Sequence, residues 1–114
     1  MNETDKADAG AAGWVSYRPE IKVLDCTIRD GGLMNDHNFD DGLVRAVYEA
    51  WVAAGGDYME LGYKNSKSLF SPDDNGPWKF CDEDAMRRIV GDNASDLKLA
   101  AMADAEKSDF REDI

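Results

Sequence analysis

Three short runs of apolar and β-branched residues alternate with two segments of helical periodicity, and this order constrains the fold more than any other feature. The runs begin near residues 21, 58 and 97. Alternating strands and helices are typical of βαβ units, in which the strands lie parallel in one sheet. The sequence therefore predicts an α/β fold with about three parallel strands and two helices.

The first βα unit has clear signals at each end. Residues 21–28 mix β-branched and apolar residues with polar ones, which predicts a buried strand. Asp40 is a good N-cap for a helix whose apolar stripe runs to Val52, and Gly55 with its following glycine ends this helix. A second strand is expected over residues 58–63.

The second unit repeats the pattern without repeating the sequence. Asp82 is expected to cap a helix that ends near Gly91. Residues 97–103 are again apolar and predict the third strand. The architecture of the first unit thus recurs in the second.

The number of strands conflicts with a self-sufficient parallel sheet. Such a sheet needs covered faces and further strands, and a complete eightfold barrel takes roughly 250 residues. We therefore interpret residues 21–114 as the incomplete N-terminal part of a TIM (β/α)₈ barrel. Residues 1–20 are expected to be a flexible leader and lead-in segment. The alternative is a small three-stranded α/β protein that stands alone.

The charge of the chain excludes several kinds of partner. Lys and Arg number 13 against 24 Asp and Glu, which gives a net charge of −11. A basic patch is needed to bind nucleic acid or an anionic membrane surface, so neither is expected as a partner. Two cysteines are too few for a disulfide framework, no apolar run could span a bilayer, and no secretory signal is evident. A cytoplasmic location is expected.

The residues after the first strand have the composition of a ligand site. Arg29 offers planar donors for an enolate or carboxylate oxygen, and Asp30 offers a carboxylate for a hard cation. Gly31 and Gly32 allow a sharp turn and close approach of a ligand. Glu60 lies on the second strand, where a buried acid needs a partner such as Arg29 or a metal-bound water. The alternative is a simple surface turn in which Asp30 caps and Arg29 is solvated.

Residues 24–32, Leu-Asp-Cys-Thr-Ile-Arg-Asp-Gly-Gly, resemble the D-x-T-x-R-D-G signature of the HMG-CoA-lyase-like, or DRE-TIM metallolyase, superfamily. Residues 58–62 are similar to the second strand of that family. The run from Asp25 to Phe39 is most similar to the 4-hydroxy-2-oxovalerate aldolase-like branch. The resemblance covers about residues 21–107 and implies a metal-dependent carbon–carbon lyase on a TIM barrel.

The resemblance implies a role for each matching residue. Asp30 matches a ligand of the catalytic divalent metal (Mg, Mn or Zn), and Arg29 matches the arginine that stabilises the enolate oxygen. Glu60 matches the acid that supports this arginine, while Asp25 and Thr27 would support the loop. The implied substrate is a small 2-oxo acid or an acyl-type carbonyl compound, cleaved through a metal-stabilised enolate. A homo-oligomer is an open possibility.

The chain also departs from the family pattern. The family completes its metal site with a later His-x-His pair, but His37 is the one histidine here, so this chain alone is expected to be inactive. Leu33 occupies the stretch in which the aldolases carry a catalytic base, and His37 is the candidate to replace it. Lys64 is a weaker candidate for a metal-free imine mechanism. The rival interpretation is a non-catalytic barrel relative or a small α/β interaction module.

A long loop after the second strand is the remaining candidate element. Residues 65–80 are rich in turn-forming residues and could close over the site, with Tyr63, Phe70 or Trp78 lining it. A plain surface excursion is the alternative. Cys81 precedes a helix, where a thiolate would be stabilised, although simple packing is the expected role.

Overall fold

The computed structural model describes residue 16 and residues 18–114. Most of the expected leader, residues 1–20, lies outside the described residues. The strands are β1 (Leu24–Asp25), β2 (Tyr58–Tyr63) and β3 (Lys98–Met102). The helices are α2 (Thr27–Gly31), α3 (Asp41–Ala53) and α4 (Glu83–Val90), and two 3-10 turns are η1 (Gly32–Met34) and η2 (Pro77–Lys79).

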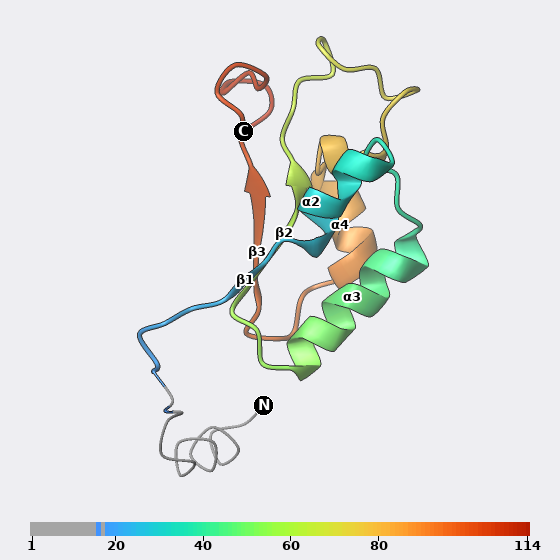
Figure 1. The fold of residues 1–114 in the computed structure, drawn as a ribbon. Coiled ribbons are helices and arrows are strands. Elements are labelled where there is room, and N and C mark those ends of the chain that lie inside the picture. The colour runs from blue at the N-terminus through green and yellow to red at the C-terminus, as the bar shows by residue number, and fades with distance from the viewer. Residues whose placement is uncertain (1–15, 17) are drawn as a thin grey trace.

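The strands form one sheet in the order β1-β2-β3, and both strand pairs are parallel (Figure 1). Tyr58 at the start of β2 is in register with Leu24 on one side and Lys98 on the other. The ladder between β2 and β3 shifts between Glu60 and Tyr63. The predicted α/β class and the parallel order of the strands are confirmed.

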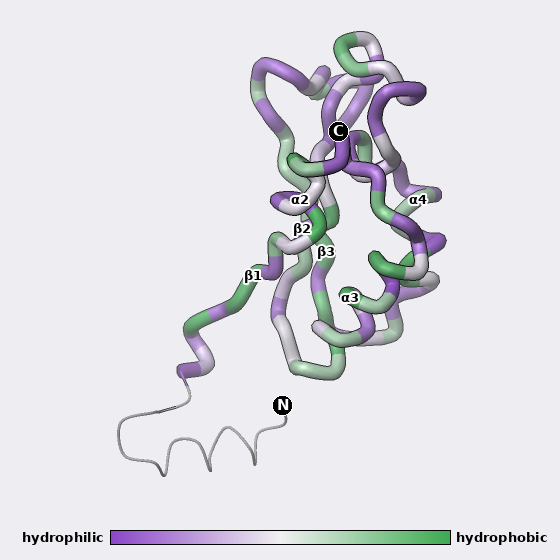
Figure 2. Tube along the Cα trace, turned by 45° about the vertical axis from the view of Figure 1, so that its right-hand side comes forward, coloured by the Kyte–Doolittle hydropathy of each residue, from purple (hydrophilic) through white to green (hydrophobic). Residues whose placement is uncertain are grey.

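The core lies between the sheet and the pair α3 and α4. Met59 and Leu61 of β2 are fully buried there, together with Val44 of α3 and Ile89 of α4. Successive side chains of a strand point to opposite faces, so Glu60, between Met59 and Leu61, points away from this core. In Figure 2 hydrophobic stretches follow the strands and the segment leading into β1, and the loops beyond the strands are largely hydrophilic.

Helix α3 begins and ends as predicted. The Asp40 carboxylate accepts a hydrogen bond from the backbone N–H of Gly42 at 2.9 Å, which satisfies one free donor of the first turn. The helix ends at Ala53, just before Gly55, whose φ is 77°. At 13 residues α3 is the longest described helix, and no helix in residues 18–114 combines the length and apolarity that crossing a membrane requires.

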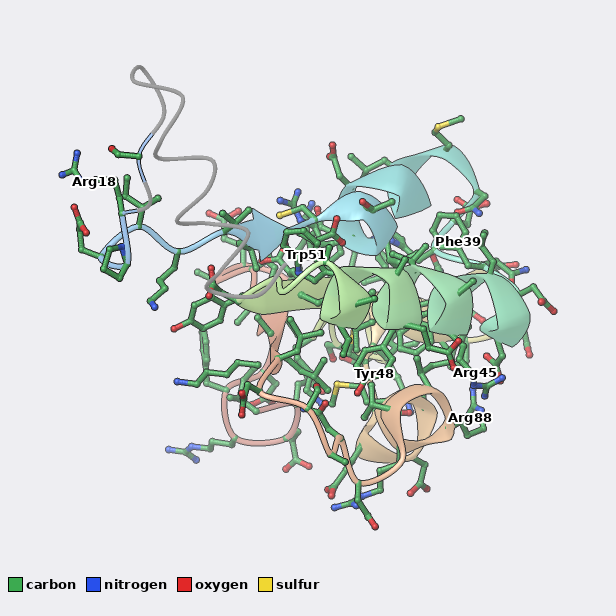
Figure 3. All side chains as sticks on the ribbon, turned by 90° about the horizontal axis from the view of Figure 1, so that it is seen from below. Arg18, Phe39, Arg45, Tyr48, Trp51 and Arg88 are labelled. Carbon is green, nitrogen blue, oxygen red and sulfur yellow. The ribbon has the colours of Figure 1, made fainter. Side chains whose placement is uncertain are left out.

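Helix α4 begins where predicted, but its predicted cap is wrong. Asp82 occupies the N-cap position, yet its side chain caps no backbone N–H and pairs instead with Lys67 Nζ at 2.6 Å. The two long helices pack side by side (Figure 3), where Arg88 pairs with Asp41 at 3.1 Å and Arg45 donates to the Arg88 carbonyl at 2.6 Å. Polar contacts therefore tie α3 to α4 outside the core.

The predicted first strand is largely wrong. Only Leu24–Asp25 pairs as a strand, Thr27–Gly31 is helical, and Ile21 and Val23 are 58% and 51% exposed. The Asp25 carboxylate accepts hydrogen bonds from the Thr27 N–H (3.2 Å) and hydroxyl (2.6 Å), which turns the chain into the helix. Because β1 has no described strand on its outer side, the apolar side chains before it stay uncovered. Ile28 alone of the run reaches the core.

Candidate functional site

The candidate site begins at the carboxyl end of β1, on the short helix α2. Arg29 and Asp30 belong to this helix and do not lie in an open turn, which corrects the expected geometry. Ligands of parallel α/β folds bind outside the carboxyl ends of the strands, and α2 lies at this end of the sheet (Figure 1). Arg29 and Asp30 therefore lie at the carboxyl end of the sheet, as expected from the sequence.

Arg29 and Glu60 form an ion pair that links α2 to the central strand. Arg29 Nε donates to Glu60 Oε1, and the two side chains keep 20% and 10% of their exposure. The hydrogen bond to Glu60 is the main reason why the pKa of Arg29 is raised above its ordinary value. Glu60 thus has the partner that its burial demands, and Arg29 is neither solvated nor free to swing away.

The remaining residues of the motif differ in exposure. Asp30 is 69% exposed and its carboxylate lies 3.7 Å from Arg29 Nη1. Asp25 and Thr27 bond to each other in the turn before the helix, which agrees with a supporting position. Asp30 is therefore presented to solvent beside a buried cation–carboxylate pair.

His37 is the most buried polar residue of the site. It is 2% exposed, its φ is 60°, and its Nδ1 has no hydrogen-bond partner among residues 18–114. Gly32 explains how the ring fits, since a Cβ on Gly32 would lie 2.1 Å from Nδ1. Burial, with a smaller contribution from Lys79, lowers the pKa of His37, so the imidazole is neutral near pH 7.

Tyr63, at the end of β2, connects these groups. Its ring centre lies 5.1 Å from that of His37 in an edge-on contact and 5.5 Å from Lys79 Nζ. The Tyr63 phenol also contributes to the raised pKa of Arg29. The structure therefore brings Arg29, Glu60, Tyr63 and His37 into one contiguous cluster.

The long loop contributes a residue that sequence reasoning missed. Lys79 Nζ lies 4.1 Å from the centre of the Phe70 ring as well as near Tyr63. Of the three aromatic residues that could line the site, Trp78 is fully buried in the core. Gly62 permits this packing, since a Cβ there would lie 1.9 Å from the Trp78 carbonyl. An isolated lysine in a turn-rich segment gave no signal of this position.

Two reactive groups proposed from sequence are tied up by the fold. Lys64 Nζ donates to the carbonyl of Cys81 at 3.0 Å, which favours a structural role over imine formation. Cys81 is fully buried, and burial raises the pKa of its thiol to about 12. The thiolate alternative for Cys81 is therefore wrong, and its expected packing role is confirmed.

The donor set does not close a metal site. No group of three or more His, Cys, Asp or Glu side chains in residues 18–114 is arranged to hold a metal ion. Asp30 is a single exposed carboxylate whose charged neighbour is the cation Arg29. The described residues therefore do not fit a divalent metal on their own.

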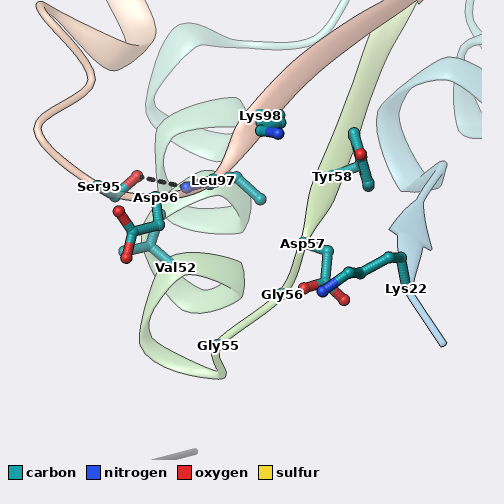
Figure 4. Close-up of a pocket in the computed structure, with 10 residues that line it drawn as sticks. All are labelled: Lys22, Val52, Gly55, Gly56, Asp57, Tyr58, Ser95, Asp96, Leu97 and Lys98. Carbon is teal, nitrogen blue, oxygen red and sulfur yellow. Dashed lines mark hydrogen bonds between the residues drawn. The ribbon is translucent and has the colours of Figure 1, made fainter. Parts of the chain in front are cut away.

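A separate hollow of about 540 Å³ lies at the opposite end of the sheet (Figure 4). It is bordered by the residues that lead into the three strands, among them Lys22, Asp57, Tyr58 and Lys98. The Asp57 carboxylate accepts a hydrogen bond from the Val23 N–H at 2.8 Å, so it is engaged in holding β1 to β2. This hollow does not adjoin the Arg29 cluster.

The fold and the cluster define a parallel α/β protein with an arginine–glutamate pair at the carboxyl end of its sheet. The chain matches no protein-family model, no curated protein and no solved structure.

Proposed function

We propose that this chain forms part of a carbon–carbon lyase that acts on a 2-oxo acid or related carbonyl compound through an enolate. The ion pair of Arg29 with Glu60 is the observation that carries the proposal. Arg29 Nε is bound to Glu60, while its Nη1 lies 3.7 Å from the Asp30 carboxylate, and Cys26 and Tyr63 also act on the guanidinium. In the proposed reaction the terminal N–H groups of Arg29 exchange these weaker contacts for an oxygen on which negative charge develops.

Glu60 acts as a positioning residue in this proposal. A guanidinium fixed by a buried carboxylate loses little side-chain entropy when it binds a ligand. The charges of Arg29 and Glu60 cancel overall. An anion is therefore attracted only to the part of the guanidinium that faces away from the Glu60 carboxylate. Preorganised donors of this kind contribute most when they face the charge of the transition state.

His37 is proposed as the group that moves a proton to or from the substrate carbon. A neutral imidazole is required of a general base, and the lowered pKa of His37 provides it near pH 7. Its contact with Tyr63 places it beside the Arg29 cluster, whereas Leu33 is exposed. His37 thus replaces the base that the motif resemblance expects near Leu33.

The proposal includes the TIM barrel and the metal as expectations from the resemblance. β1 and β3 are each bonded to one described strand only, so further strands, from the rest of a longer protein, would extend the sheet. Those strands would have to provide the ligands that join Asp30 around Mg, Mn or Zn. Oxygen from a single carboxylate is insufficient for tight binding of such an ion.

Exchange of the pyruvate methyl protons with D₂O tests the proposal directly, because it requires enolate formation and no second substrate. We expect the protein that contains this chain to exchange them with added Mg or Mn, observed as loss of the methyl ¹H signal. Arg29→Met should reduce the rate by about 100-fold or more. Arg45→Met, on α3 at the far side of the core, is the matched control. Equal rates in the two variants would refute the role of Arg29.

The alternative is an α/β module that binds partners and catalyses nothing. The incomplete donor set favours it. A folded protein that exchanges no pyruvate protons with any of the three metals, and yields no pyruvate from 4-hydroxy-2-oxo acids, would refute the lyase proposal and favour this alternative.

A further inference from the structure

Several lysines lie at the carboxyl end of β2 and β3, interspersed with a larger number of aspartate and glutamate residues. Four of the seven lysines, Lys64, Lys67, Lys79 and Lys107, lie in three segments that follow or adjoin these strands. Backbone bonds join the segments: Asn65 N–H donates to the Lys79 carbonyl at 3.1 Å, and Ser66 N–H donates to the Lys107 carbonyl at 2.8 Å. The consecutive residues Asn65 and Ser66 are thus bonded to the backbone of Lys79 and of Lys107, respectively.

The four lysines differ in what neutralises them. Lys64 donates to a carbonyl, and Lys67 is paired with Asp82 at 2.6 Å. Lys107 has a longer contact, 3.8 Å, with Asp104. Lys79 forms no ion pair within the described part of the chain, where its Nζ lies instead over the rings of Phe70 and Tyr63.

The surroundings of Lys79 are unfavourable for a cation without a counterion. Its pKa is lowered, first by burial and then by repulsion from Lys107, while Asp36 and Asp104 oppose the shift. The two aromatic rings hold the ammonium in place and stabilise it only in part. An oxyanion between Lys79 and Lys107 would relieve both the repulsion and the missing partner.

We propose that Lys79 and Lys107 bind an oxyanionic group, a carboxylate or a phosphate, at the far end of the substrate whose carbonyl faces Arg29. Tyr63 lies between the two points of attachment, because its ring centre is 5.5 Å from Lys79 Nζ and 5.1 Å from the ring of His37, the proposed base. In a simple 2-oxo acid the carboxylate adjoins the carbonyl. The substrate class is therefore a 2-oxo acid with a second, distal negative charge, and this inference rests on the proposed function.

The test compares the binding of two probes, 2-oxoglutarate and pyruvate, which differ by the distal carboxylate. Titrations followed by ¹H–¹⁵N NMR measure both affinities with the full chain. We expect 2-oxoglutarate to bind about tenfold more tightly, as one charge-assisted contact allows. Lys79→Met should remove this preference, and Lys79→Arg should retain it. The preference should also fall as salt is raised.

Lys98→Met is a matched control, because Lys98 also lies over an aromatic ring, 5.9 Å from the centre of Tyr58, at the opposite end of the sheet. It should keep the preference for 2-oxoglutarate. If Lys79→Met fails to fold, the exposed Lys107 replaces it as the test, since Lys107→Met should reduce the preference in the same direction. An unchanged preference in these variants, or equal affinities for the two probes in the unmodified chain, would overturn the inference.

Two further arms separate the sources of failure. Inorganic phosphate is titrated as a competitor of 2-oxoglutarate. If it competes and shifts the amide NMR signals of residues 63–66, phosphate binds in the same site. If it does not compete, the oxyanion that Lys79 and Lys107 bind is a carboxylate. A Lys79-dependent preference without pyruvate proton exchange would refute the enolate chemistry and retain the anion site. Pyruvate proton exchange without a Lys79-dependent preference would refute the anion site and retain the enolate chemistry.

Discussion

Replacement of Glu60 by glutamine isolates the energy of the central ion pair. Glu60→Gln removes the negative charge while keeping the shape, and it leaves the guanidinium of Arg29, 20% exposed, with no carboxylate at hydrogen-bond distance. Loss of one partner of a buried pair costs about 3–5 kcal/mol. We expect about 3 kcal/mol, the low end, because Asp30 lies 3.7 Å from Arg29 Nη1 and offers partial compensation.

The free energy of unfolding is measured by urea denaturation of the full chain. At a slope of about 1.5 kcal/mol per M, a loss of 3 kcal/mol lowers the midpoint by about 2 M. Glu83→Gln is the matched control, because it breaks the exposed pair with Arg87 and should scarcely move the midpoint. The apolar double variant Arg29→Met/Glu60→Leu should recover most of the loss, since neither charge is then buried alone.

A midpoint for Glu60→Gln within the error of the unmodified chain would refute this reasoning. It would mean that Arg29 reaches solvent easily and that the pair is a surface contact. The proposed enolate role would suffer as well, because a mobile guanidinium is not preorganised. A double variant as unstable as Glu60→Gln would instead indicate that packing, and not charge, explains the cost.

Two further predictions concern stability. The pKa of His37 is lowered in the folded chain, so the neutral ring contributes fully to the free energy of unfolding above the unfolded pKa of about 6.5. This contribution is lost as the pH falls through the folded pKa. The urea midpoint should therefore drop between pH 7.5 and 5, and His37→Gln should make that drop smaller. Asp40→Ala should cost about 1 kcal/mol in the same assay by removing the α3 cap, whereas Asp82→Ala, which removes no cap, should cost less. Equal costs for the two aspartates would contradict the assignment of the caps.

The strand–helix order could be predicted from sequence because its signals are local. The Asp40 cap and the strand over residues 58–63 follow from spacing and composition within one element. Asp82 shows the limit of such local evidence. Its position at the start of α4 is visible in the sequence, but the lysine that draws its carboxylate away is 15 residues distant.

The first strand was misjudged for a related reason. Apolar periodicity in residues 21–28 reports a preference for burial, and burial requires a neighbour on the outer side of β1 that the described residues do not provide. The turn into α2 depends on hydrogen bonds from Thr27 to Asp25, which compete with strand pairing. The motif residues were therefore located correctly along the chain but on the wrong element.

The candidate site was predictable where a motif marks it and unpredictable where loops assemble it. Arg29 was one of two partners expected for Glu60, the other being a metal-bound water, because a buried acid needs a partner. Lys79 gave no such signal, because its place depends on Phe70, on Tyr63 and on a backbone bond to Asn65. Gly62 makes the arrangement possible by admitting the Trp78 carbonyl against β2, a contact that cannot be deduced from a single glycine.

The net charge of −11 raises the question of how an anion reaches this site at all. At physiological salt the screening length is about 8 Å, so distant carboxylates contribute little and the nearest one dominates. Asp104, 3.8 Å from Lys107 and close enough to act on Lys79, is that carboxylate. Asp104→Asn keeps an acceptor for the Glu106 N–H and should therefore leave the turn intact.

We accordingly expect Asp104→Asn to tighten the binding of 2-oxoglutarate about two- to fivefold, the value of one exposed charge contact. Asp92→Asn neutralises an equal charge at the far end of α4 and should leave the affinity unchanged in the same NMR titration. If both variants tighten binding equally, the total charge of the chain governs its affinity for anions. If neither does, Asp104 does not oppose the bound anion, and the proposed site between Lys79 and Lys107 is refuted.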